Sequence, residues 1–158
     1  MTHTNLPNPA GSLRKILFLD FDGVLHPAWG NSLPEFVHAH ALAQAIAGRP
    51  CEIVISSTWR EHYPLAQLKQ FLVPELAGRV IGVTGQDPPG RYPRHKAILQ
   101  YLATVGEEVD WRALDDSGAE FHECPNLILC DGAVGLQRAQ VEQVSEWLDD
   151  GSFTCGSA

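Results

Sequence analysis

The segment from Lys15 to Leu25 reads Lys-Ile-Leu-Phe-Leu-Asp-Phe-Asp-Gly-Val-Leu. Its apolar run has no polar alternation, which is typical of a strand buried on both faces of a parallel sheet. Asp20 and Asp22 follow that run, and on an extended segment their side chains project to the same side. Two carboxylates in one small volume favour a hard divalent cation such as Mg²⁺. Gly23 allows a sharp turn, so the segment predicts a buried strand that ends in a ligand-binding site.

The same four residues, Asp-Phe-Asp-Gly, also fit a metal-free turn, because Asp and Gly are common turn residues. A hydrophobic strand followed by Asp-x-Asp-Gly resembles the first motif of the haloacid dehalogenase (HAD) superfamily. The resemblance implies that Asp20 is a nucleophile and that Asp22 is a general acid and base. It also implies Mg²⁺ ligands from Asp20 and from the main-chain carbonyl of Asp22.

Composition restricts the class of protein. A chain of 158 residues with 44% hydrophobic residues is the size of one globular domain. A net charge of −8 argues against a broad nucleic-acid-binding face. We expect residues 1–12 to form a flexible arm with no secretory signal, residues 13–150 the HAD-like domain, and residues 151–158 a tail.

The cysteines and the hydropathy predict a cytoplasmic protein without a membrane segment. No apolar run reaches the length of a membrane span. The four cysteines, Cys51, Cys124, Cys130 and Cys155, form no C-x-x-C pair. They are therefore expected to be free thiols in a reducing compartment, and a zinc site is not expected.

Periodicity predicts five strands that alternate with helices. The expected strands cover residues 16–19, 52–55, 79–84, 111–114 and 127–130, and the expected helices cover residues 31–48, 61–76, 93–105 and 137–148. Such alternation predicts a three-layer α/β/α sandwich with a Rossmann-like, mainly parallel sheet. The HAD resemblance supplies the strand order 5-4-1-2-3, and the short connections leave no room for a substantial cap domain.

The end of the second strand carries hydroxyl groups in Ser-Ser-Thr-Trp-Arg. The resemblance implies that one hydroxyl here contacts the transferring phosphoryl group. We assign that role to Ser56, with Ser57 as the alternative, although either serine also suits a helix cap. Arg60 is expected to bind a phosphate oxygen through its guanidinium group. We expect Trp59 to pack against other side chains of the protein, and stacking on a nucleic-acid base is the second interpretation.

The third motif of the superfamily is a Lys or Arg near the start of a helix. Lys96 is assigned to it by position, with Arg94 as the alternative. Arg91, Arg94, His95 and Lys96 also form a local basic cluster that could attract an anionic substrate.

Asp115 and Asp116 follow the fourth strand and match the acidic fourth motif of the superfamily. Adjacent buried acids repel each other, so a cation at this position is expected. Asp116 is assigned as a direct Mg²⁺ ligand, and Asp115 as a direct or water-mediated one. Asp131, after the fifth strand, is expected to cap the last helix.

These assignments predict a Mg²⁺-dependent phosphatase that forms an aspartyl-phosphate intermediate. A phosphotransferase and a non-catalytic phosphate-binding module are the alternatives. An uncapped site suggests a large substrate, such as a phosphoprotein or a nucleic-acid end. Asp-Phe-Asp-Gly-Val-Leu-His-Pro, Ser-Ser-Thr-Trp-Arg and Leu-Asp-Asp-Ser are similar to HAD domains of Swiss Army knife RNA repair proteins. That similarity implies phosphate removal from nucleic-acid ends, although the net charge does not support it. The oligomeric state is left open.

Overall fold

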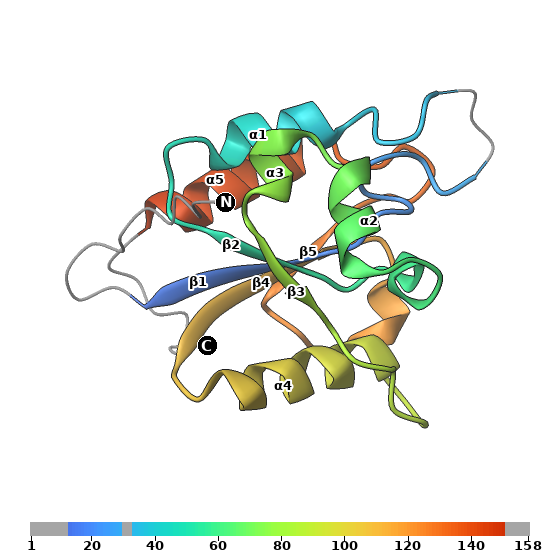
Figure 1. Ribbon diagram of the computed structural model, residues 1–158, viewed down its shortest axis with the longest axis vertical. Helices are drawn as coiled ribbons and strands as arrows, with labels where there is room; N and C mark the ends of the chain where they lie inside the picture. The colour runs from blue at the N-terminus through green and yellow to red at the C-terminus, as the bar shows by residue number, and fades with distance from the viewer. Residues whose placement is uncertain (1–12, 30–32, 151–158) are drawn as a thin grey trace.

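Five parallel strands form one sheet in the order β3-β2-β1-β4-β5. The computed structural model describes residues 13–29 and 33–150 (Figure 1). The strands are β1 (Arg14–Leu19), β2 (Glu52–Ile55), β3 (Val80–Val83), β4 (Val109–Asp115) and β5 (Leu127–Leu129). The expected strand order is thereby confirmed, read from the opposite edge.

Helices cover both faces of the sheet unequally. The α-helices are α1 (Ala39–Ile46), α2 (Leu65–Phe71), α3 (Pro74–Ala77), α4 (Pro93–Val105) and α5 (Arg138–Asp149). Two 3₁₀ turns, η1 (Thr58–Glu61) and η2 (Gly118–Glu120), follow β2 and β4. In Figure 1, α1 and α5 lie on one side of the sheet and α4 on the other. The expected three-layer sandwich is confirmed.

The central strand β1 shows why its sequence lacks polar alternation. Leu17 and Leu19 pack with side chains of α1 and α5, whereas Ile16 and Phe18 pack with Ile98 of α4. All four of these β1 side chains are fully buried. A strand between two helical layers needs apolar side chains on both faces.

Two expected helices are shorter than the sequence pattern indicated. Phe36 has a left-handed backbone (φ 60°), and α1 begins only at Ala39. The helix expected at 61–76 is two helices, because Leu72 is extended and Pro74 starts α3. Proline disfavours a helical conformation at the residue before it, so the break at Val73 could have been predicted.

The connections between strands match the expectation of an uncapped domain over the described residues. Only α4 lies between β3 and β4, and only α1 lies between β1 and β2. None of the helices in this part of the chain combines the length and apolar composition that crossing a membrane requires. The expected arm (1–12), the expected tail (151–158) and residues 30–32 lie outside the described residues.

Candidate active site

Three polar side chains stand in one row where neighbouring strands end. Leu19 of β1 is in register with Ile55 of β2 and with Leu114 of β4. The next residues are Asp20, Ser56 and Asp115. The pairing continues to this row, because the Asp20 amide donates to the Leu114 carbonyl and the Ser56 amide donates to the Leu19 carbonyl.

The row lies on the face of the sheet that α4 covers. Side chains alternate along a strand, so Asp20, Ser56 and Asp115 face the same way as the residues two positions earlier. Those earlier residues are Phe18, Val54 and Ala113, which pack with Ile98 of α4. The first turn of α4 is therefore the nearest source of a counter-charge on this face.

Arg94, and not Lys96, supplies that charge. The Arg94 Nη1 lies 2.9 Å from the Asp115 Oδ2 and 3.3 Å from the Asp20 Oδ2, and Arg94 is buried. Lys96 is exposed. The first choice for the third motif was therefore wrong and its alternative fits. Pro93 starts the helix, and on an α-helix Arg94 and Lys96 point about 200° apart, so only one of them can face the sheet.

The expected basic cluster is correspondingly divided. Arg94 is buried against the carboxylates, whereas the His95 Nδ1 accepts a hydrogen bond from the His122 amide. The Arg91 guanidinium lies 6.0 Å from the centre of the Tyr92 ring. Arg94 therefore does not contribute to an exposed basic surface.

Asp20, Asp115 and Asp116 could together hold a metal ion. One carboxylate oxygen from each lies within 4.8 Å of the others. Asp115 is fully buried, and it accepts hydrogen bonds from Arg94 and from the Ser117 amide. Within the described residues no hydrogen bond reaches the Asp116 carboxylate. Its oxygens remain available, which favours Asp116 as the direct ligand and Asp115 as the group that holds Arg94.

Two glycines let the main chain approach Asp116 closely. Gly23 has φ +76°, and a Cβ on it would overlap the Asp116 carboxylate. A Cβ on Gly132 would lie 2.5 Å from the Asp116 Oδ2. Gly23 was expected to serve a turn next to the substrate, and the structure gives it this further steric role. Gly132 was missed, because an isolated Asp-Gly pair is a common turn signal.

The electrostatics of the cluster favour a cation. Burial raises the pKa of Asp20 well above its ordinary value, and repulsion from Asp115 adds to the rise. Burial likewise raises the pKa of Asp115, against the attraction of Arg94. Burial lowers the pKa of Arg94, but attraction to Asp115 and Asp20 outweighs that effect, so the net shift is upward and Arg94 stays protonated.

A divalent cation fits this charge and this donor set. When the three carboxylates are ionised, the single guanidinium of Arg94 leaves two negative charges unbalanced. Carboxylate oxygens are the ligands that Mg²⁺ prefers in proteins. The residues present therefore fit a divalent metal site.

Two buried polar groups beside Asp20 lack partners. Ser56 Oγ and Arg94 Nε make no hydrogen bond within the described residues. Buried polar groups in proteins are nearly always paired, so an unpaired group beside a cluster of charges suggests a missing ligand. The Ser57 Oγ, in contrast, accepts from the Trp59 amide and caps η1. This arrangement favours Ser56 over Ser57 for the phosphate contact.

The Asp22 carboxylate is held by two donors that sequence reasoning missed. Its Oδ1 lies 2.7 Å from the His26 Nε2, and its Oδ2 accepts from the Trp59 indole Nε1 at 3.0 Å. The Phe36 amide donates to the His26 Nδ1, so the ring proton lies on Nε2 and faces Asp22. His26 and Trp59 thus fix where Asp22 points, and the only sequence signal was their place next to Asp-Phe-Asp-Gly and next to the serines after the second strand.

Arg60 is not available to bind a phosphate. Its guanidinium donates to the carbonyls of Ser56, Ser57, Thr84 and Gly85 and to the Asp87 carboxylate. Its side chain is only 4% exposed. The five N–H groups of an arginine are all used by these contacts, so the assigned phosphate contact was wrong. Arg60 instead ties the segment after β2 to the segment after β3.

Asp131 does not cap the last helix. Its Oδ1 accepts from the Ala133 amide inside a turn. Gln137 precedes α5, and it forms a reciprocal capping box with Gln140. The sequence prediction failed because Gln is a less common capping residue than Asp.

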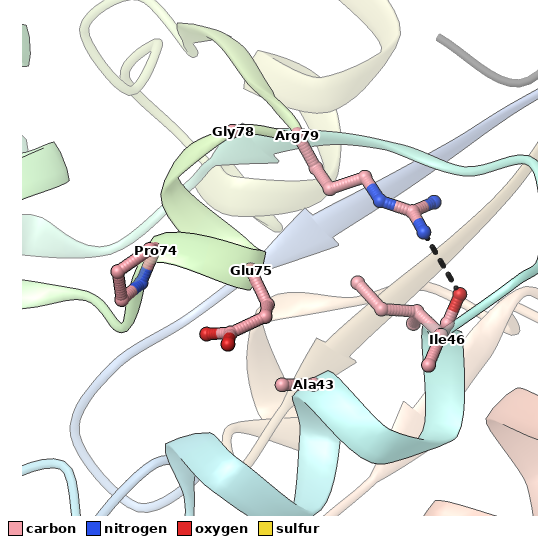
Figure 2. A pocket seen from close by; sticks show the side chains of 7 residues that line it. Ala43, Ile46, Pro74, Glu75, Gly78 and Arg79 are labelled. Atoms are coloured by element: carbon pink, nitrogen blue, oxygen red, sulfur yellow. Dashed lines mark hydrogen bonds between the residues drawn. The ribbon is translucent and has the colours of Figure 1, made fainter. Parts of the chain in front are cut away.

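A hollow of about 250 Å³ between α1 and α3 lies elsewhere (Figure 2). Its basic side chain, Arg79, donates to the Ile46 carbonyl and to other main-chain oxygens. Arg79 precedes β3, whereas the acidic cluster follows the ends of β1 and β4. This hollow therefore lies at the amino-terminal ends of the strands, whereas the cluster lies at their carboxyl ends.

One protein-family model matches the chain. The family described as "HAD domain in Swiss Army Knife RNA repair proteins" matches residues 16–141, which include every residue of the cluster. No curated protein and no solved structure matches the chain.

Proposed function

Because the chain belongs to the family of HAD domains in Swiss Army Knife RNA repair proteins, we propose that this HAD hydrolase is a Mg²⁺-dependent phosphatase with Asp20 as nucleophile. The observation that carries the proposal is the buried Asp20 carboxylate among two further carboxylates and Arg94, next to unpaired donors. A phosphoryl group placed there supplies the oxygen acceptors that Ser56 Oγ and Arg94 Nε lack.

Mg²⁺ would be held by Asp20, Asp116 and the main-chain carbonyl of Asp22. Asp115 would hold Arg94 in place beside them. The ion would offset negative charge on the phosphoryl oxygens when the carboxylate nucleophile approaches. Arg94 adds a positive charge on the side of α4. Ser56 donates to one phosphoryl oxygen.

In the first step the Asp20 carboxylate attacks phosphorus and forms an aspartyl-phosphate. The bond from phosphorus to the leaving oxygen breaks, and Asp22 donates a proton to that oxygen. In the second step Asp22 takes a proton from water, which attacks phosphorus; the bond from phosphorus to the Asp20 oxygen breaks, inorganic phosphate leaves, and the Asp20 carboxylate is restored. His26 and Trp59 keep Asp22 in place through both steps, since each donates to one of its oxygens.

The connections between strands support a large substrate. No additional domain is inserted between β1 and β4 in the residues that the structure describes. An open site gives access to a phosphate at the end of a polymer, and we propose a nucleic-acid end as that polymer. The free thiols of Cys51, Cys124 and Cys130 support a reducing cytoplasm as the compartment.

The test is hydrolysis of 4-nitrophenyl phosphate. The wild-type protein should turn over this substrate with Mg²⁺ and lose activity with a chelator. Asp20→Asn should abolish turnover, whereas Asp149→Asn, which removes a surface carboxylate paired with Arg49, should keep it. Unchanged turnover in Asp20→Asn would refute the assignment of the nucleophile.

A further inference from the structure

A second feature of the site is a hollow of about 350 Å³ beside Asp22. Its walls include Asp22, His26, Pro27, Trp29, Glu35 and Trp59. A volume of this size suits a small molecule or one unit of a polymer. Because Asp22 serves the leaving oxygen, the hollow lies where the leaving group of a substrate would be.

Trp29 stands at this hollow with much of its surface uncovered. It is 64% exposed, the largest value among the exposed large hydrophobic residues in the described part of the chain. The residue before it is tied to the turn after β5, because the Ala28 amide donates to the Gly132 carbonyl at 2.7 Å. A Cβ on Gly132 would meet both the Trp29 ring, at 3.0 Å, and the Asp116 carboxylate. The indole therefore lies against Gly132, on the side of the cluster where the Asp116 carboxylate is.

Trp59, which also lines the hollow, is fully engaged in contacts within the protein. Its indole N–H is bonded to Asp22, and its ring packs against Phe21, Phe36 and Phe71. Trp29 has no such aromatic neighbours among the described residues. Of the two indoles, Trp29 is the one that can offer a ring face to a ligand.

The charge of the hollow separates it from the phosphate position. Glu35 carries a carboxylate here, so a phosphate is repelled and stays on the side of Arg94 and Ser56. A neutral, flat group with hydrogen-bond donors is favoured instead, because a ring stacks on Trp29 and donors reach Glu35. A nucleoside has both the base and the hydroxyl or amino donors, whereas a phenyl ring has no such donors.

We propose that the hollow binds the nucleoside part of the substrate, with its base stacked on Trp29 and its polar donors directed to Glu35. This inference rests on the proposed phosphatase function and names the class of leaving group. Stacking of a base on an aromatic side chain commonly contributes enough to change binding about tenfold or more.

Binding is measured first, without turnover, in the Asp20→Asn protein with Mg²⁺. A nucleoside monophosphate should bind about tenfold more tightly than ribose 5-phosphate. The preference should vanish in Asp20→Asn/Trp29→Ala and largely remain in Asp20→Asn/Trp29→Phe. Asp20→Asn/Leu99→Ala, which truncates an exposed side chain on α4, should keep the full preference. Equal affinities for the two ligands, or a preference that survives Trp29→Ala, would overturn the proposal.

Turnover then identifies the source of the nucleoside. We expect a higher kcat/KM on an oligonucleotide with a terminal phosphate or on a mononucleotide than on glycerol phosphate. Trp29→Ala should lower kcat/KM on both nucleic-acid substrates about tenfold more than it lowers kcat/KM on glycerol phosphate. A phosphotyrosine peptide as the best substrate would overturn the nucleoside assignment. Absence of turnover on every phosphate would contradict the phosphatase itself, whereas turnover without a base preference would contradict only the nucleoside pocket.

Discussion

Arg94 is the side chain on which the charge balance of the site depends. It contacts Asp20 and Asp115, and Glu120 lies 3.6 Å from its Nη2. Removing one partner of a buried ion pair leaves uncompensated charge, which costs about 3 kcal/mol or more. The same guanidinium faces the proposed phosphoryl position, so both stability and catalysis should depend on it.

Arg94→Met should therefore lower kcat about 100-fold or more with 4-nitrophenyl phosphate. Arg94→Lys should keep part of the rate, because it retains the charge but loses the paired geometry. Lys96→Met is the matched control and should behave as the wild type, since Lys96 is exposed. Steady-state kinetics check this. Loss of activity in Lys96→Met with retention in Arg94→Met would show that Lys96, and not Arg94, serves the third motif.

His26 and Trp59 are positioning residues for Asp22. Removing one hydrogen bond to a charged group costs about 1.5–3 kcal/mol, so His26→Phe and Trp59→Phe should each lower kcat on an alkyl phosphate at least tenfold. The loss should be smaller on 4-nitrophenyl phosphate, whose leaving group needs little protonation.

The conservative variant His26→Gln should recover part of the rate on the alkyl phosphate, because a Gln amide can also donate to Asp22. Comparing kcat on the two substrates separates this role from a general loss of structure. Equal losses on both substrates would contradict the positioning of Asp22.

At the scale of elements, Arg60 joins two segments that follow neighbouring strands. Its contacts run from the carbonyls of Ser56 and Ser57 to the segment at Thr84 to Asp87. Arg60→Met should therefore lower the free energy of unfolding by about 2–3 kcal/mol, because it leaves buried oxygens unpaired. Urea denaturation measures this change.

The kinetic result distinguishes that structural role from the phosphate contact expected from the sequence. If Arg60 only holds the two segments, the KM of the folded variant should change little. A large rise in KM with unchanged stability would show that Arg60 contacts the substrate after all.

The elements differ in how well the sequence predicted them. The central strand was predictable because an apolar run without alternation has few other interpretations. The start of α1 was not predictable, since the left-handed backbone at Phe36 leaves no sequence signal. The choice between Arg94 and Lys96 also failed, because it depends on which way the first turn of α4 faces the sheet.

The same limit applies to the site as a whole. Asp20, Asp22, Asp115 and Asp116 follow strands, and parallel strands bring such residues together at one edge of the sheet. The donors to Asp22 come from His26 in the adjoining turn and Trp59 after the next strand, and only the packed structure shows that both reach the same carboxylate.

At the scale of the whole molecule, a divalent cation should stabilise the fold in a pH-dependent way. The raised pKa values of Asp20 and Asp115 mean that their contribution to stability is present at low pH. It is lost as the pH rises through those raised values, because the folded state must then carry repelling carboxylates. The rise in Tm with Mg²⁺ should accordingly be larger at pH 8 than at pH 5, in thermal melts with Mg²⁺ or with a chelator.

Two glycine variants serve as the matched pair for this measurement. Gly23→Ala should abolish the Mg²⁺-dependent rise, because its Cβ overlaps the Asp116 carboxylate. Gly48→Ala has the same strained backbone, with φ +72°, but no atom within 4 Å of its Cβ. It should lower Tm in both conditions and keep the rise. An equal rise at both pH values, or a full rise in Gly23→Ala, would contradict the metal site.

The most direct measurement of the central claim is to trap the covalent intermediate in Asp22→Asn. With 4-nitrophenyl phosphate and Mg²⁺ the first step needs little help from an acid, whereas the second step lacks its base, so phosphorylated protein should accumulate. After acid quench and tryptic digestion, mass spectrometry should find a phosphoryl group on Asp20, within the peptide Ile16 to Arg60. Hydroxylamine should remove this group, as it does from an acyl phosphate. The double variant Asp20→Asn/Asp22→Asn should carry none, and a label on any other residue, or rapid turnover with no label, would contradict the account.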